Sequence, residues 1–246
     1  MDLEGEDRLM IGDAFAYLLD GSHWSGSEGM LGQLGQQLLL TVTALVLTMA
    51  LALPVALLLG HLGRGGFLAI NISNVGRAVP TFAVLILLSV GPLGTAVLGP
   101  YGRAGLATLV ALTLFALPPI ITNAYVGMRE VDRDTVEAAR GMGMDGRQLF
   151  FSVELPLAMP LILTGLRLAL VQVWATATIA ALVAGPGLGN VITAGFYRSD
   201  YGKGLAGAIV VAAVALVLEA LAALAERYAD PLATVQRRQR AMVAVA

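Results

Sequence analysis

The sequence predicts an all-α polytopic membrane protein with about five core transmembrane helices, six being possible. Of its 246 residues, 57% are hydrophobic and 13% are charged, and the mean hydropathy is +0.80. Apolar residues gather in long runs, the first being an uncharged stretch of 22 residues from Leu38 to Leu59. At 1.5 Å per residue such a run crosses a hydrocarbon core about 30 Å thick.

Composition also excludes several classes of function. The net charge of −2 leaves no basic surface for nucleic acid, and the absence of cysteine excludes disulfides and thiolate metal sites. His23 and His61 are isolated and have no metal-ligand spacing. We therefore expect no bound metal and no cofactor in this chain.

The N-terminal segment, residues 1–35, differs from the rest of the chain. Residues 1–30 contain seven acidic residues and one arginine, and no positively charged start leads into an apolar run, so we do not interpret this segment as a signal peptide. A short surface helix is expected from Met10 to Leu19, followed by a loop over residues 22–29.

Four further apolar runs predict the remaining spans, which cover Phe67–Val90, Ala104–Met128, Leu157–Ala184 and Leu205–Ala225. Pro54 is expected to kink the first span. A glycine-rich connection over residues 185–190 precedes a possible short helix that ends before Tyr197. A sixth span would require splitting the fourth run, because no other apolar stretch is long enough.

The second span has a polar face next to a helix break at Pro80. Its polar residues recur at helical spacing: Asn71, Asn74, Arg77 and Thr81. Polar groups in a membrane helix face a bundle interior, a partner or an aqueous path. Hydrogen bonding between helices and lining of a translocation path are both open interpretations.

Two charges interrupt the last two spans. Arg167 and Glu219 lie at depths that differ by about 5 Å at 1.5 Å of rise per residue. An unpaired charge inside a membrane is costly, so we predict an intramembrane ion pair. Structural pairing and direct contact with a substrate are both possible roles.

A polar island separates the third and fourth spans, over residues 131–160. Asp134 precedes Glu137 by three residues, and Asp145 precedes Gln148 by three, so each pair is expected to form a capping box at the start of a short helix. Glycines are expected to end the first helix, at Gly141 and Gly143. Prolines then predict a bend where the island re-enters the membrane, at Pro156 and Pro160.

The basic residues predict the orientation of the chain. With the N-terminus outside, nine arginines fall inside, and three arginines and one lysine fall outside. This places the polar island and the C-terminus in the cytoplasm. We accordingly divide the chain into an extracytoplasmic segment (1–35), a transmembrane domain (36–228) whose cytoplasmic loop covers residues 129–156, and a cytoplasmic tail (229–246).

Motifs for nucleotide binding and catalysis are absent or accidental. Gly141, Gly143 and Gly146 fit G-x-G-x-x-G, but no strand precedes them and no acidic residue follows at about 20 residues. No G-x-x-x-x-G-K-[ST] motif occurs. Without a catalytic constellation, the chain is expected to be a non-enzymatic membrane subunit.

The polar island resembles the EAA loop of permease subunits in bacterial ABC importers. The residues that carry the resemblance are Glu137, Ala138, Ala139, Gly143, Val153, Leu155 and Pro156. Val153 departs mildly from the motif, which usually has isoleucine there. The resemblance implies that this loop is a coupling helix which docks on a separate ATPase subunit, with Glu137, Ala138, Ala139, Gly143, Leu155 and Pro156 as its coupling residues.

The resemblance extends over roughly residues 35–230. RAVPTFAVLILL (77–88) and GLRLALVQVWATATIAALVAGPGLGNVI (165–192) are similar to permeases of osmoprotectant importers for glycine betaine, choline, carnitine or proline betaine. Methionine-type permeases share the fold. The resemblance implies two ATPase subunits that use ATP and Mg, a second permease subunit (a copy or a related chain) and an extracytoplasmic binding protein. That binding protein is expected to be a separate chain, because this one ends at Ala246.

The function expected from this resemblance is ATP-driven import by alternating access across the bacterial inner membrane. Candidate residues of the translocation path or gate are Asn74, Arg77, Pro80, Thr81, Gly187 and Gly189. Import of methionine or another amino acid is an alternative, and a membrane scaffold, a sensor or an intramembrane enzyme are more distant ones. The cargo itself is not readable from the sequence, because betaine recognition relies largely on aromatic cages in the binding protein.

Overall fold

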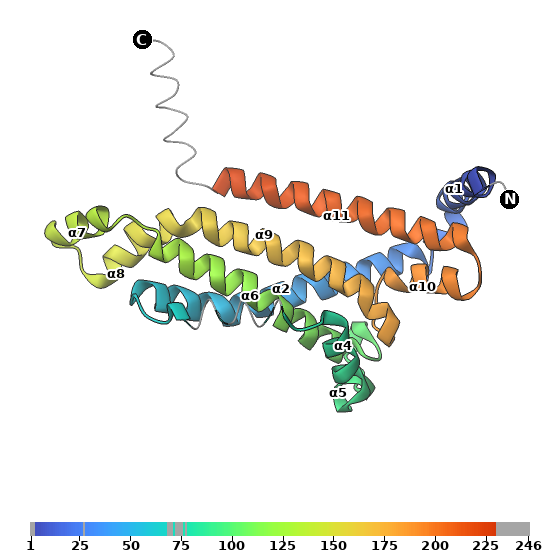
Figure 1. Cartoon of the computed structure of the whole chain (residues 1–246), viewed down its shortest axis with the longest axis horizontal. Coiled ribbons are helices and arrows are strands. Elements are labelled where there is room, and N and C mark those ends of the chain that lie inside the picture. The colour runs from blue at the N-terminus through green and yellow to red at the C-terminus, as the bar shows by residue number, and fades with distance from the viewer. Residues whose placement is uncertain (1–2, 27, 68–70, 72–75, 77, 230–246) are drawn as a thin grey trace, which may run out of the picture. The chain divides into compact units, whose positions relative to one another are not determined.

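The computed structural model describes residues 3–26, 28–67, 71, 76 and 78–229. Within these residues the protein is helical and has no strand (Figure 1). The elements in chain order are α1 (Leu3–Leu19), η1 (Gly21–Trp24), α2 (Met30–His61), α4 (Thr81–Val90), α5 (Pro92–Thr95), η2 (Gly99–Tyr101), α6 (Gly105–Arg129), α7 (Arg133–Gly141), α8 (Gly146–Leu149), η3 (Phe150–Glu154), α9 (Leu155–Ile179), η4 (Ala180–Val183), α10 (Gly189–Tyr197) and α11 (Tyr201–Ala229).

Four stretches of helix in the described residues are long and apolar enough to cross a membrane. They cover Met30–His61, Gly105–Arg129, Gly146–Val183 and Tyr201–Tyr228. They contain the first, third, fourth and fifth predicted spans almost completely. The second predicted span, Phe67–Val90, lies partly outside the described residues, and its later part forms the ten-residue helix α4.

The first span begins earlier in the structure than in the sequence analysis. Helix α2 starts at Met30, eight residues before Leu38. The added turns contain glutamines, which are good helix formers although they are polar. One of them, Gln37, is completely buried. The apolar run therefore marks only part of a longer helix.

The chain forms two compact units, and the four long helices each contribute a segment to both. Unit 1 contains Met1–Val46, Val79–Phe115 and Leu170–Leu218, and unit 2 contains Leu47–Ala78, Ala116–Ala169 and Glu219–Ala246. The first predicted loop, the α10 region and the glycine-rich connection belong to unit 1. The polar island and the Arg167–Glu219 pair belong to unit 2.

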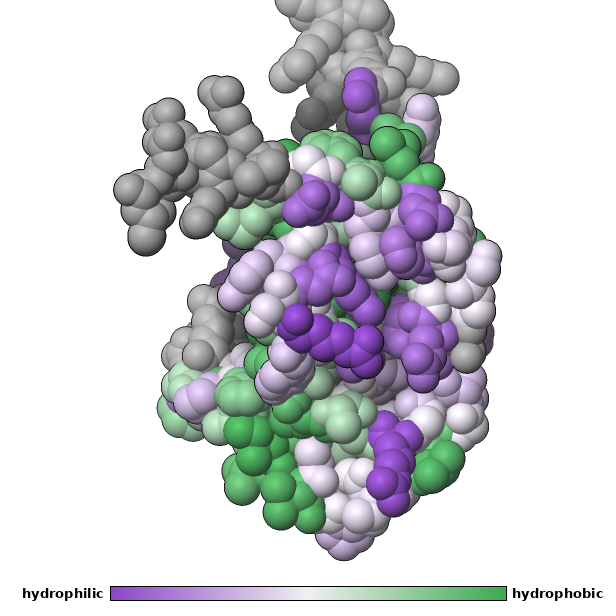
Figure 2. Space-filling model, turned by 90° about the vertical axis from the view of Figure 1, so that its right-hand side faces the viewer, coloured by the Kyte–Doolittle hydropathy of each residue, from purple (hydrophilic) through white to green (hydrophobic). Residues whose placement is uncertain are grey.

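The core of unit 1 is built around a buried tryptophan. Trp174 is 1% exposed, and its indole N–H donates to the carbonyl of Val211 on α11 at 3.1 Å. The same core includes Ala14 of α1, so the expected N-terminal surface helix exists and packs on this unit. Figure 2 shows one face of the molecule, with hydrophilic residues gathered in its middle and hydrophobic residues at its lower left.

Unit 2 depends on close approach between helix backbones. A Cβ atom on Gly60 of α2 would lie 2.5 Å from the Cβ of Met128 on α6. A Cβ on Gly165 of α9 would lie 2.7 Å from the Cβ of Asn123 on α6. Small residues at such crossings let helices pack tightly, which is the main source of cohesion between helices in lipid.

Candidate functional site

The polar island folds into α7 and α8 of unit 2, and the first cap differs from the sequence prediction. Asp132 is the N-cap of α7, and its Oδ1 accepts from the N–H of Asp134 at 2.8 Å. The predicted capping box of Asp134 with Glu137 is therefore wrong. Because α7 begins at Arg133, Asp134 already lies in the first turn, where its negative charge still complements the helix dipole.

Glycine ends α7, as predicted from the sequence. Gly141 is the last helical residue, and Gly143 has φ +88°, a left-handed conformation that favours glycine. The N–H of Gly143 donates to the carbonyl of Arg140 at 2.9 Å, and the N–H of Met144 donates to the carbonyl of Ala139 at 3.3 Å. This pair of bonds is the Schellman pattern of helix termination.

The second capping box is confirmed, whereas the predicted departure from helix at the residue before Pro156 is wrong. Asp145 accepts from the N–H of Gln148 at 2.7 Å, and Gln148 accepts from the N–H of Asp145 at 3.1 Å. From α8 the helix continues without a break through the π-helical turn η3 into α9. Leu155, before Pro156, has helical φ −62° and ψ −46°.

The π turn explains how the chain stays helical through Leu155 and Pro156. The N–H of Leu155 bonds to the carbonyl of Phe150, five residues back. This shift of the hydrogen-bond ladder puts Pro156 at the start of a new α-helical stretch, where its missing N–H is tolerated. Pro160 lies inside α9. One continuous helix therefore runs from Gly146 to Val183.

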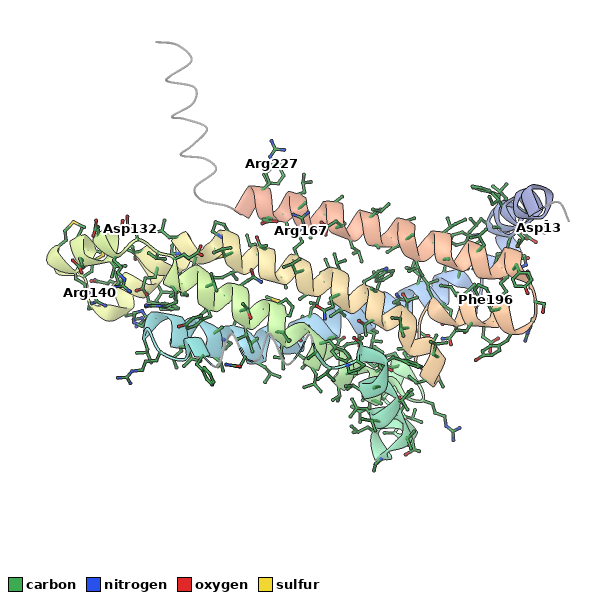
Figure 3. The ribbon with its side chains drawn as sticks, in the orientation of Figure 1. Asp13, Asp132, Arg140, Arg167, Phe196 and Arg227 are labelled. Carbon is green, nitrogen blue, oxygen red and sulfur yellow. The ribbon has the colours of Figure 1, made fainter. Side chains whose placement is uncertain are left out.

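The residues of the EAA resemblance divide into an exposed and a packed set. Glu137, Ala138 and Gly143 are exposed, and Met142 beside them is 74% exposed. Ala139 is 3% exposed, whereas Leu155 and Pro156 are half-buried. Helix α7 therefore packs through Ala139 and leaves a small, open face available to a partner. Figure 3 labels Asp132 and Arg140 in this loop.

A histidine–glutamate contact fixes the connection between α2 and the loop, and the sequence analysis missed it. Nδ1 of His61 contacts Oε2 of Glu154, which is 6% exposed. The ring of Phe150 lies edge-on to His61, with centroids 5.4 Å apart. The two residues border a polar cavity of about 180 Å³ lined also by Arg129, Arg133, Glu137 and Arg140. The available signal in the sequence was a glutamate two residues before Pro156, where the chain turns apolar.

Arg167 and Glu219, the pair expected from the sequence, lie in contact. The Nε of Arg167 donates to Oε1 of Glu219 at 2.7 Å, and NH2 contacts the same oxygen. A second acid completes the cluster, because NH1 of Arg167 donates to Oε2 of Glu226 at 3.1 Å and Thr164 donates to its Oε1 at 2.6 Å. Arg227 extends away from this cluster (Figure 3).

The polar face predicted on the second span is only partly visible. Asn74 and Arg77 lie outside the described residues. Pro80 is the N-cap of α4, with φ −63° and ψ 114°, and Thr81 is the first residue of that helix. A helix start directly after Pro80 agrees with the predicted break. The amide of Asn71 donates to the carbonyl of Phe67 at 2.6 Å.

The glycine-rich connection lies on a polar cluster that the sequence analysis did not foresee. Gly187 has φ +121°, and the N–H of Leu188 donates to Oε1 of Gln37 at 2.9 Å. Gly189 begins α10. The missed residues, Gln33, Gln37 and Asn190, lie at the margins of apolar runs, and their only sequence signal is their amide chemistry.

No group of three or more potential metal-ligating side chains occurs among the residues that the structure describes. Long apolar helices, a capped polar loop and a charge cluster between two of these helices define the class as a polytopic membrane protein with an exposed polar loop.

The chain belongs to the family of binding-protein-dependent transport system inner membrane components, which it matches over residues 51–232. Helix α1 and the first two-thirds of α2 precede the matched region. Membership places the chain in a membrane and in a transport system that depends on a binding protein. Its orientation in that membrane remains a prediction.

Similar proteins are permeases for osmoprotectants. The carnitine transport permease protein OpuCB of Listeria monocytogenes is 35% identical over 195 residues, which cover 78% of this chain and 84% of the relative. The glycine betaine/carnitine/choline permease protein OpuCB of Bacillus subtilis is 30% identical over 209 residues, covering 84% and 91%.

Solved structures show the same fold. A chain of the MetNI methionine ABC transporter in an inward-facing conformation superposes with a TM-score of 0.66 at 19% identity, covering 81% of this chain and 95% of that one. A chain of an amino acid ABC transporter crystallised with histidines gives a TM-score of 0.63 at 22% identity, covering 81% and 93%. The predicted ABC importer permease fold is confirmed.

Proposed function

We propose that this chain is the permease subunit of an ATP-driven importer of osmoprotectants, with quaternary amines such as glycine betaine, choline, carnitine or proline betaine as cargo. The support for this cargo is the 35% identity to a carnitine permease and the 30% identity to a glycine betaine/carnitine/choline permease. The likeness to the methionine transporter is below 25% identity and supports the fold alone.

The observation that carries the mechanism is the exposed face of α7. Glu137 and Ala138 are exposed on a helix capped by Asp132 and ended by Gly143. Because Ala138 is small, α7 can approach the wall of a groove in a partner ATPase closely, with the carboxylate of Glu137 beside the contact. That partner binds ATP and Mg and closes on ATP binding. The push on α7 is relayed through the continuous helix that begins at Gly146, and alternating access results.

The assembly we propose contains two ATPase subunits, a second permease subunit and an extracytoplasmic binding protein. The second permease is a copy of this chain or a related one. Residues 1–35 lie outside the cell membrane, residues 36–228 form the transmembrane domain, and residues 229–246 lie in the cytoplasm. In this orientation the coupling loop (129–156) faces the ATPases. No chemistry is assigned to this chain itself.

The test is uptake by the complete transporter. The permease is expressed with the ATPase and binding protein of its own operon in cells that lack osmoprotectant importers, and uptake of labelled glycine betaine, choline, carnitine, proline betaine and methionine is measured. We expect uptake of at least one quaternary amine and none of methionine. An ATPase subunit with its catalytic glutamate replaced by glutamine is the control.

Two results would contradict the proposal. Uptake of methionine without uptake of any quaternary amine would assign the chain to amino-acid import. Failure of any ATPase to co-purify with the permease would favour a scaffold or sensor instead.

A further inference from the structure

Two glutamines of α2 bind the backbone at the start of α10 in unit 1, one at its N-cap residue and one at the residue before it. Oε1 of Gln37 accepts from the N–H of Leu188 at 2.9 Å, and Oε1 of Gln33 accepts from the N–H of Gly187 at 3.3 Å. The first N–H groups of a helix have no partner within that helix. Leu188, the N-cap of α10, provides no side-chain cap. The N–H groups of Asn190 and Val191 bond to the carbonyls of Gly187 and Leu188, whereas the N–H of Leu188 is satisfied by another helix.

The amide of Gln37 joins α2 to two other helices. Its side chain is 0% exposed, and its Nε2 donates to the carbonyl of Trp174 at 3.3 Å and to Oγ1 of Thr178 at 2.9 Å, both on α9. Its donors and its acceptor are thus all engaged. A buried amide that loses a partner pays the desolvation cost of that group. Movement of α2, α9 and α10 as one body keeps every bond.

Glycines seat the connection directly on these helices. A Cβ atom on Gly187, at φ +121°, would lie 2.9 Å from Oε1 and 3.0 Å from the Cβ of Gln37. A Cβ on Gly189 would lie 2.1 Å from the carbonyl oxygen of Thr178. No side chain fits at either position. The glutamine amides therefore reach backbone N–H groups that any other residue would shield.

Asn190 closes the connection on itself and on α2. Its Nδ2 lies 3.0 Å from the carbonyl oxygens of both Gly185 and Gly187, and 3.4 Å from Oε1 of Gln33. These contacts fold residues 185–190 into a compact turn beside Gln33. The start of α10 is held by polar contacts with fixed geometry, so small shifts of α2 are transmitted to it.

We infer that Gln33 and Gln37 are positioning residues for transport, which hold α10 to α2 and α9 through the transport cycle. The inference rests on the proposed function. Helix α10 ends in two exposed aromatic residues, Phe196 at 61% and Tyr197 at 83% exposure, on the side we assign to the extracytoplasmic space. The cap fixes how this surface is presented to the binding protein.

The test uses the full transporter in nanodiscs with Gln33→Met or Gln37→Met in the permease. The measured quantity is the ratio of ATP hydrolysis with the loaded binding protein to hydrolysis without it. We expect this ratio to fall about five- to tenfold, as loss of one or two net hydrogen bonds implies. Gln33→Glu keeps the acceptor for Gly187 and is expected to restore the ratio. Gln36→Met is the matched control, because the bonds to Gly187 and Leu188 come from Gln33 and Gln37, and it should leave the ratio unchanged.

Hydrogen exchange separates positioning from a general loss of stability. Amide exchange in peptides that contain Gly187 and Leu188 should rise in both methionine variants, while exchange in α6 stays at the wild-type rate. A uniform rise across the permease would overturn the inference. If Gln37→Met does not assemble, the inference is tested on the half-buried Gln33 alone. A wild-type hydrolysis ratio together with wild-type amide exchange in Gln33→Met would then overturn the inference.

The proposed cargo and this inference fail separately. Absence of quaternary-amine uptake by the wild-type transporter contradicts the cargo. The response of the hydrolysis ratio and of amide exchange to Gln33→Met is measured with whichever ligand loads the binding protein, and it alone decides the role of the glutamines.

Discussion

Arg167 carries one positive charge and contacts two carboxylates, Glu219 and Glu226. All three side chains lie on apolar helices, where an unpaired charge is costly. Thr164 donates to Glu226 and satisfies the second acid partly. Removal of Arg167 therefore leaves two carboxylates without their positive partner. Removal of Glu219 alone leaves Arg167 paired with Glu226.

This arrangement predicts an asymmetric mutational response. Arg167→Ala should lower the yield of folded permease several-fold, whereas Glu219→Ala should have a smaller effect because Glu226 remains. Arg167→Ala with Glu219→Ala should recover only part of the yield, and adding Glu226→Gln should recover most of it. Fluorescence-detected size-exclusion chromatography measures the yield. Full recovery in the double variant would show that Glu226 does not depend on Arg167.

The caps of the coupling loop give a second prediction at the scale of residues. Asp132→Ala and Asp145→Ala should each destabilise the loop by about 1 kcal/mol, the usual value of an N-cap. Asp134→Ala should cost much less, because its side chain caps nothing in the structure. Amide hydrogen exchange over residues 132–149 measures all three. An equal response to Asp132→Ala and Asp134→Ala would contradict the observed cap.

Sequence reasoning recognised charges within apolar runs and missed polar groups at their edges. Arg167 and Glu219 stand out because each interrupts an otherwise uncharged run, and helical rise places them at similar depth. Glu226 follows Glu219 by seven residues, two turns along the same face, but it lies where the apolar run has already ended. Gln33 and Gln37 precede the apolar run. In that position the sequence does not distinguish a glutamine buried between helices from one exposed to water.

At the scale of elements, the turn that follows α7 depends on a glycine for conformation and not for space. Gly143 has φ +88°, but a Cβ there would meet nothing within 4 Å. A side chain can therefore be accommodated if the backbone keeps its left-handed conformation. Asparagine adopts this conformation readily and β-branched residues do not.

Gly143→Val should therefore impair the loop, while Gly143→Asn should be tolerated. We expect the valine variant to insert into the membrane normally but to lose most co-purifying ATPase and most transport. The asparagine variant serves as the control for the added side chain. ATPase co-purification and uptake are the measurements, and wild-type values for Gly143→Val would remove this loop from the coupling role.

Element boundaries were predictable where local chemistry decides them. The start of α8 follows from a capping box and the end of α7 from glycine, and both lie where the residues indicate. The continuity of α8 with α9 was not predictable, because it depends on a π turn over Phe150–Glu154. Such a turn has no residue signature. It allows the residue before the following proline to stay helical, whereas that residue is usually biased away from helix.

At the scale of the whole molecule, hydropathy predicted four spans that the structure describes, and basic residues predicted an orientation that is still untested. The absence of cysteine from the chain makes a direct test simple. Met142 is 74% exposed in the coupling loop and Tyr197 is 83% exposed at the end of α10. A single thiol at either position is expected to be accessible from one side only.

In intact cells, a membrane-impermeant maleimide should label Tyr197→Cys and leave Met142→Cys unlabelled. In inside-out vesicles the labelling should reverse. Labelling after detergent solubilisation, where both thiols react, is the control for reactivity. The opposite labelling pattern would show that the orientation is inverted and that α7 lies outside the compartment that contains ATP.

The π turn between α8 and α9 also sets a rotational phase. Each residue of an α-helix turns the chain by about 100°, and the π turn, whose N–H of Leu155 bonds five residues back to Phe150, holds one residue more than an α-helical turn. The direction in which the exposed face of α7 points is thus fixed by a count of residues between Gly146 and Pro156. Substitutions in this stretch leave that count unchanged, whereas a residue inserted into the α-helical turns beside the π turn would rotate α8 by about 100° around the axis of α9.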